Sequence, residues 1–71
     1  NGNILVQSKV AQVISLNVFD MTGRKMYGSR YNLSFGYNSL TISSAQWGTG
    51  IYLFNFQTSA GEKFVFKAIK Q

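Results

Sequence analysis

Residues 51–70, IYLFNFQTSAGEKFVFKAIK, contain two runs with aromatic residues at alternate positions, joined by a short polar segment. The segment at 59–61 (SAG) has the composition of a three-residue hairpin loop, whose third residue adopts a left-handed conformation that glycine tolerates. If the pairing of the two strands were shifted by one residue, Lys67 would lie opposite Phe54. The alternation therefore specifies the register of the hairpin. The predicted pairs are Thr58 with Glu62, Gln57 with Lys63, Phe56 with Phe64, Asn55 with Val65, Phe54 with Phe66, Leu53 with Lys67, Tyr52 with Ala68, and Ile51 with Ile69.

This register places the aromatic rings on one face of the hairpin and Lys63 and Lys67 on the other. A surface that stacks nucleic-acid bases would need its rings and its basic groups on the same solvent side. Phenylalanine is commonly buried, and these rings are the largest apolar side chains that so small a domain offers. We therefore expect an aromatic core formed by Phe54, Phe56, Phe64 and Phe66.

Alternation with a period of two recurs along the chain, and no segment keeps a helical period. Strands are predicted over residues 3–8, 13–19, 24–30, 38–43, 51–58 and 62–70, with turn-rich segments between them. Several short strands separated by turns indicate an all-β sandwich or barrel. With 71 residues the chain forms one domain.

A second hairpin is predicted around residues 21–23 (MTG), which again place glycine third. The same count puts Asp20 opposite Arg24 and Val18 opposite Met26. The Asp20 carboxylate is then positioned to bond the turn backbone and to pair with Arg24. The buried row of this hairpin is expected to be Ile14, Leu16 and Val18.

Tyr52 follows Gly50 at the start of a strand, an arrangement typical of the tyrosine corner of β-sandwiches, in which the buried ring returns its hydroxyl to nearby backbone. Gly48 and Gly50 allow the incoming loop to turn sharply. Trp47 is interpreted as a lid over one end of the core.

The composition argues against catalysis and metal binding. The chain has no cysteine and no histidine, which removes thiol nucleophiles, disulfides and nearly all transition-metal sites. Its two acidic residues, Asp20 and Glu62, are too few for acid–base catalysis or a hard-cation site. We predict no enzymatic activity and no cofactor. No run of about 18 apolar residues is present, so no membrane insertion is expected.

Four segments, LNVFDMTGRKM, GYNSLTIS, GTGIYLFNF and the terminal KAIK, resemble in order and spacing the type A C-terminal sorting domain of the type IX secretion system of Bacteroidetes. The resemblance covers about residues 3–71. The family usually opens with a Pro-Asn-Pro-like segment, and this chain has no proline, so we expect a single sorting domain over residues 1–71 that is trimmed at its N-terminus. The positions that match the family motif are Asp20, Gly23, Arg24, Gly36, Asn38, Gly50, Tyr52, Lys67 and Lys70.

The resemblance implies a small immunoglobulin-like antiparallel β-sandwich that belongs covalently to a larger cargo protein. Such a domain is recognised by the outer-membrane secretion machinery and is often removed by a sortase, so that the cargo is secreted or displayed on the cell surface. Recognition would require a basic C-terminus, an exposed strand edge, or both.

Two other functions compete with this interpretation. A surface-adhesion or carbohydrate-binding module would need exposed planar rings, for which Tyr27, Tyr31, Tyr37 and Trp47 are the candidates. The net charge of +5 is compatible with a small nucleic-acid-binding barrel, but the separation of rings and lysines argues against a nucleic-acid partner.

Overall fold

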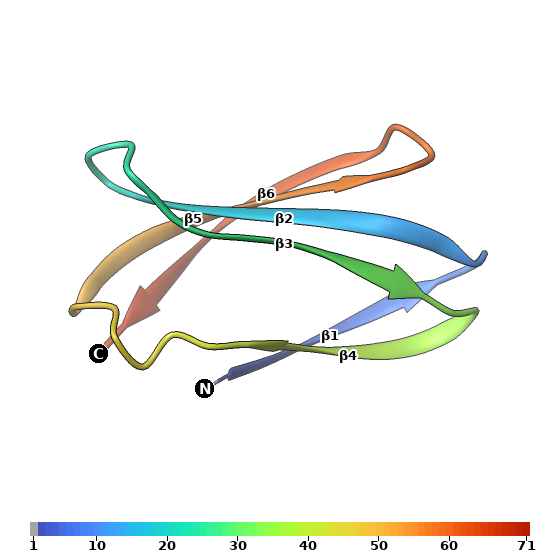
Figure 1. Cartoon of the computed structure of the whole chain (residues 1–71), viewed down its shortest axis with the longest axis horizontal. Helices are drawn as coiled ribbons and strands as arrows, with labels where there is room; N and C mark the ends of the chain where they lie inside the picture. The colour runs from blue at the N-terminus through green and yellow to red at the C-terminus, as the bar shows by residue number, and fades with distance from the viewer. Residues whose placement is uncertain (1) are drawn as a thin grey trace.

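The computed structural model describes residues 2–71, which form six strands in two antiparallel sheets packed as a sandwich (Figure 1). One sheet has the order β1-β4 and the other the order β3-β2-β5-β6. None of these residues belongs to a helix long and apolar enough to cross a membrane. All six predicted strands are confirmed, with the bounds β1 (Gly2–Ser8), β2 (Gln12–Asp20), β3 (Lys25–Leu33), β4 (Gly36–Ile42), β5 (Gly50–Thr58) and β6 (Lys63–Lys70).

The chain crosses between the sheets three times, from β1 to β2, from β3 to β4 and from β4 to β5. The other two connections are the hairpins β2–β3 and β5–β6. The resulting fold is the expected immunoglobulin-like sandwich. The hairpin β5–β6 has the predicted register, including Phe54 opposite Phe66 and Leu53 opposite Lys67. Gly61 in its loop has φ = 95°, a conformation that side chains with a Cβ rarely adopt.

The register of hairpin β2–β3 differs from the prediction by one residue. Asp20 and Arg24 do meet at its mouth, where the Asp20 N–H donates to the Arg24 carbonyl at 2.9 Å. Beyond them, however, Val18 lies opposite Tyr27 and not opposite Met26. A β-bulge causes the shift, because Met26 is an extra residue between the pairs formed by Val18 and Phe19.

The core lies between the sheets, and its central row is the predicted one. Ile14, Leu16 and Val18 on β2 are at most 3% exposed. Tyr52, Phe54 and Phe56 on β5 pack beside them and are also buried.

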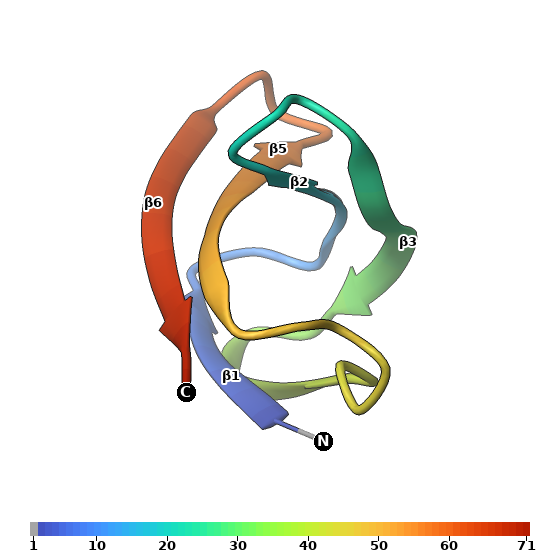
Figure 2. The same ribbon diagram turned by 90° about the vertical axis from the view of Figure 1, so that its left-hand side faces the viewer.

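The expectation that the aromatic row would be wholly buried is wrong for strand β6. Phe64 is 50% exposed and Phe66 is 42% exposed, although both point to the inner face. The reason is the unequal size of the sheets, since a two-stranded sheet faces a four-stranded one. Figure 2 shows the consequence, with β6 at the margin of the larger sheet and β1 the nearest strand of the smaller one.

Candidate functional site

The turn between β2 and β3 holds three of the motif positions. One carboxylate oxygen of Asp20 accepts hydrogen bonds from the Thr22 hydroxyl at 2.6 Å, the Arg24 N–H at 2.9 Å and the Thr22 N–H at 3.0 Å. The other oxygen lies 3.3 Å from Nε of Arg24. Gly23 has φ = 89°, which the turn requires. Asp20 therefore acts as the organiser of this turn.

The pKa of the Asp20 carboxyl is lowered below its ordinary value. The largest cause is the hydrogen bond from the Thr22 hydroxyl, followed by the bond from the Arg24 backbone N–H, and the charge of Arg24 adds a smaller effect. All of these contacts stabilise the ionised form. The carboxylate is thus committed to the turn as an acceptor and is unsuited to acid–base chemistry.

A second turn, between β3 and β4, is organised by Asn38. Its side-chain Nδ2 donates to the carbonyls of Ser34 at 3.0 Å, Gly36 at 3.1 Å and Val6 at 3.4 Å. Its Oδ1 accepts from the Ser34 N–H at 2.9 Å. Gly36 has φ = 101°, in the region that favours glycine. Asn38 thereby fixes the turn and also ties it to strand β1.

The third group lies where the chain enters β5. The Tyr52 hydroxyl donates to the Gly48 carbonyl at 2.5 Å, which confirms the predicted tyrosine corner. Gly50 has φ = 150° and is exposed. Trp47 is half-buried and packs against Tyr52, with ring centroids 4.9 Å apart, and against Phe54. The interpretation of Trp47 as a lid over the core is therefore confirmed.

The two motif lysines on β6 point in different directions. Lys67 is exposed on the outer face of the sheet, opposite Leu53. Lys70 is half-buried on the inner side, where its Nζ donates to the carbonyl of Ser44 in the segment between β4 and β5. Lys70 therefore has a structural contact that Lys67 does not share.

The fold brings most of the motif positions to one end of the sandwich. Strand pairing places Asp20 opposite Tyr52, and Gly50 opposite Lys70, at the end where β2 stops and β5 begins (Figure 1). The turn with Gly23 and Arg24 lies at the same end. Gly36 pairs with Ser8 at the other end, and Asn38 lies nearby. The motif is thus not one compact site.

The family model of the secretion system C-terminal sorting domain matches residues 1–71. The chain belongs to this family. Comparisons with curated proteins and with solved structures find no significant match. The family is a type IX secretion signal and not an enzyme family, and proteins that carry such a domain are exported to the cell surface or secreted.

Within this sorting domain the motif side chains fall into two classes. Asp20, Asn38 and Tyr52 make hydrogen bonds to backbone groups close to them in sequence, so they shape turns. The side chain of Arg24 is 74% exposed in spite of its contact with Asp20, and Lys67 is exposed as well. These two basic groups are the motif side chains best placed to meet a partner.

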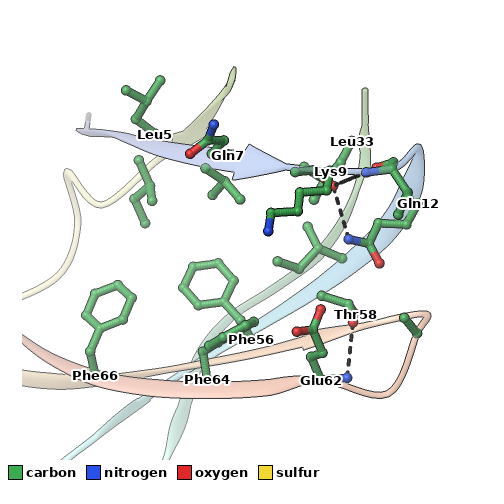
Figure 3. A pocket seen from close by; sticks show the side chains of 16 residues that line it. Leu5, Gln7, Lys9, Gln12, Leu33, Phe56, Thr58, Glu62, Phe64 and Phe66 are labelled. Atoms are coloured by element: carbon green, nitrogen blue, oxygen red, sulfur yellow. Dashed lines mark hydrogen bonds between the residues drawn. The ribbon is translucent and has the colours of Figure 1, made fainter. Parts of the chain in front are cut away.

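A feature that the sequence analysis did not find is a cleft of about 550 Å³ between β1 and the β5–β6 hairpin (Figure 3). Ile4 and Val6 line it from one sheet, and Phe56 and Phe64 from the other. A second hollow of about 250 Å³ shares Ile4 with the cleft and extends the opening toward Lys70. No local pattern in the sequence predicts this cleft, because it depends on how the two sheets are arranged. The lysines at positions 63, 67 and 70 indicate only that their strand is a sheet edge.

Proposed function

We propose that this domain directs a larger cargo protein across the outer membrane by the type IX secretion system and is then removed by a sortase. The observation that carries the proposal is the family match over the whole chain. Within that framework, the outer-membrane machinery contacts the basic outer face of β6, on which Lys67 stands exposed. An acidic or polar receptor surface complements this basic face, and the charge complementarity would favour this domain over proteins that lack the basic face.

The structure distinguishes the two terminal lysines as targets for mutation. Replacing Lys70 removes the contact with Ser44, so a loss of export would mix folding with recognition. Replacing Lys67 alters an exposed side chain, where substitutions usually change stability by less than about 0.5 kcal/mol. Arg30 offers a control, because it is an exposed basic residue of the same sheet, lies on β3 opposite Ser15 and away from β6, and is not a motif position.

The test fuses a signal peptide, a reporter, the natural upstream segment and this domain in a bacterium with a type IX system. We expect the parent and Arg30→Glu fusions to reach the surface or the medium, and Lys67→Glu to accumulate in the periplasm with an unchanged melting temperature. Normal export of Lys67→Glu would show that this lysine is not recognised. Retention of the parent fusion in the periplasm would contradict the sorting function itself.

Removal by a sortase is tested on the exported reporter. If the domain is cleaved, the surface or medium fraction contains a reporter that is shorter by the mass of the domain and carries a new C-terminus. An exported reporter that keeps the full domain would contradict the cleavage step while leaving the export function intact.

The adhesion or carbohydrate-binding alternative has less support from the candidate rings. The hydroxyls of Tyr27 and Tyr31 bond each other at 2.6 Å, and both residues are half-buried. Trp47 is packed on the core, whereas Tyr37 is 71% exposed. A platform for a sugar needs several exposed rings on one surface, and these four do not provide one.

A further inference from the structure

Strand β6 is an edge strand with an open side. Within residues 2–71 its hydrogen-bonded neighbour is β5 alone. The Thr58 N–H donates to the Glu62 carbonyl at the start of the ladder, and bonded and non-bonded pairs alternate along antiparallel strands. The backbone N–H and C=O groups of Lys63, Val65 and Lys67 therefore point away from β5, toward the open side. A row of unpaired donors and acceptors is a template for another strand.

The inner face of this edge is apolar and incompletely covered. Phe64 and Phe66 are about half exposed, and both contribute to the wall of the cleft. Figure 3 shows their rings directed toward β1 across the opening. The volume of about 550 Å³ lies in the range of protein binding pockets. A strand added beside β6 would place alternate side chains in this cleft, where apolar groups cover the two rings.

The outer face of the same edge is basic. Lys63 and Lys67 lie on it four residues apart, with Val65 between them on the same face. Lys9 lies at the mouth of the cleft on the side of β1. Glu62 is the one acidic residue near this opening. Side chains directly opposite each other on one face of a sheet interact, and opposite charges stabilise the pair. An added strand would thus be stabilised by carboxylates at its outward positions.

We propose that the cleft and the free edge of β6 bind an extended strand of another protein, with apolar side chains alternating with acidic ones. The apolar residues cover Phe64 and Phe66, and the acidic residues pair with Lys63 and Lys67. Assignment of this strand to the secretion machinery rests on the function proposed above, whereas the binding itself does not.

A second copy of the domain is a poorer occupant on grounds of charge. Antiparallel pairing of two β6 strands about Val65 places Lys63 of each copy directly opposite Lys67 of the other. Like charges directly opposite each other destabilise strand pairing, and lysines on an edge are a common protection against self-association. The charge pattern therefore favours an acidic partner strand over dimerisation.

The test uses a synthetic peptide of about nine residues, the length of a long strand, in which glutamate and valine alternate. Binding is measured by NMR titration of the isotope-labelled domain at low salt. Two control peptides have the same length: one replaces glutamate by lysine, and one has the same composition with the glutamates grouped at one end. We expect saturable shifts confined to β6 and the cleft with the alternating acidic peptide, and no binding of either control.

Two variants of Val65 test the role of the edge. Val65→Pro removes an N–H that points to the open side, a position in which edge strands tolerate proline. We expect it to weaken peptide binding by about tenfold or more, because it deletes a main-chain hydrogen bond and obstructs pairing. Val65→Ala keeps the N–H and is expected to bind like the parent. Circular dichroism of both variants verifies that the sheet is intact.

Three results would overturn the proposal: no binding of the alternating peptide, binding that Val65→Pro leaves unchanged, or a dimer of the domain in sedimentation that Val65→Pro dissociates. The last result would make a second copy the occupant. Because the titration uses the isolated domain, it is independent of export. In the reporter fusion, Val65→Pro is expected to block export and Val65→Ala to permit it. Normal export of a folded Val65→Pro fusion would show that the machinery is not the partner.

Discussion

The two lateral sides of the sandwich are built differently. On the side of β3 and β4 the sheets are joined, since the Tyr31 hydroxyl donates to the Thr41 carbonyl at 3.3 Å. Leu33 and Leu40 are buried there, each 4% exposed. On the side of β1 and β6 the sheets are separated by the cleft, and Phe64 remains 50% exposed. We call these the joined side and the open side.

The contrast shows that side-chain type does not decide burial in this domain. Phe56 and Phe64 face the same way and lie directly opposite each other on neighbouring strands. Phe56 is 5% exposed and Phe64 is 50% exposed. The difference arises because the strands of the smaller sheet cover β5 but not β6. Burial therefore follows from how many strands face each position.

The largest effect is expected from a comparison of one truncation on each side. Leu33→Ala removes a buried side chain on the joined side and should lower the free energy of unfolding by about 2–5 kcal/mol. Phe64→Ala removes more atoms but from a half-exposed position, so its cost should be about 1 kcal/mol. Urea denaturation of the two variants and the parent measures both values. Equal costs would mean that the cleft is closed in solution.

The sequence predicts most of the fold because its signals are local. The register of β5–β6 follows from a three-residue loop and an alternation that tolerates no slip, and the tyrosine corner follows from Gly50 and Tyr52. The bulge at Met26 was missed because one extra residue in a strand leaves the turn composition unchanged. The exposure of Phe66 was missed because it depends on the number of strands in the opposite sheet, which no local pattern specifies.

The sequence predicted less of the candidate site than of the fold. The nine motif positions follow from the family resemblance and stay a prediction as recognition residues, whereas the role of Asp20 in its turn was derived correctly. Lys67 and Lys70 point to opposite faces because successive side chains of a strand alternate between the faces and the two positions are three residues apart. The contact of Lys70 with Ser44 was not predictable, because the segment at 43–49 has no regular structure from which its path can be derived. The cleft required the arrangement of both sheets.

The second prediction concerns Asn38, whose side-chain hydrogen bonds stabilise the turn between β3 and β4 on the joined side. Asn38→Asp keeps the size and the acceptor of the side chain but loses the Nδ2 donor. The carbonyls of Ser34, Gly36 and Val6 then lose their common partner and face a negative charge. We expect a loss of about 1–3 kcal/mol in the free energy of unfolding. A neutral result in urea denaturation would show that the turn is held by the backbone alone.

The third and smallest effect concerns the hydroxyl of Tyr31, which bonds the hydroxyl of Tyr27 and the carbonyl of Thr41. Burial, followed by the hydrogen bond with Tyr27, raises the pKa of Tyr31 to about 12. The folded state therefore keeps this proton more tightly than the unfolded chain, in which tyrosine has a pKa of about 10. The stabilisation is complete below about pH 10 and is lost as the pH rises toward 12.

Tyr31→Phe removes this contribution, and at neutral pH it should cost about 0.5–1.5 kcal/mol. The difference in stability between parent and variant should shrink between about pH 10 and pH 12. Comparison of the two proteins cancels the titration of the lysines, which occurs in the same range. A difference that stays constant across this range would contradict a proton held at Tyr31.

The one-sided pairing of β6 also has a dynamic consequence. Along this strand, amide groups that bond β5 alternate with groups that point to the open side, so solvent exchange of the amide hydrogens should alternate between slow and fast from one residue to the next. Among the described residues β6 pairs with β5 alone, so an opening of β6 would leave the pairing of β3, β2 and β5 intact. Such an opening would free the lysines of β6 from the sandwich without unfolding the other strands of the larger sheet.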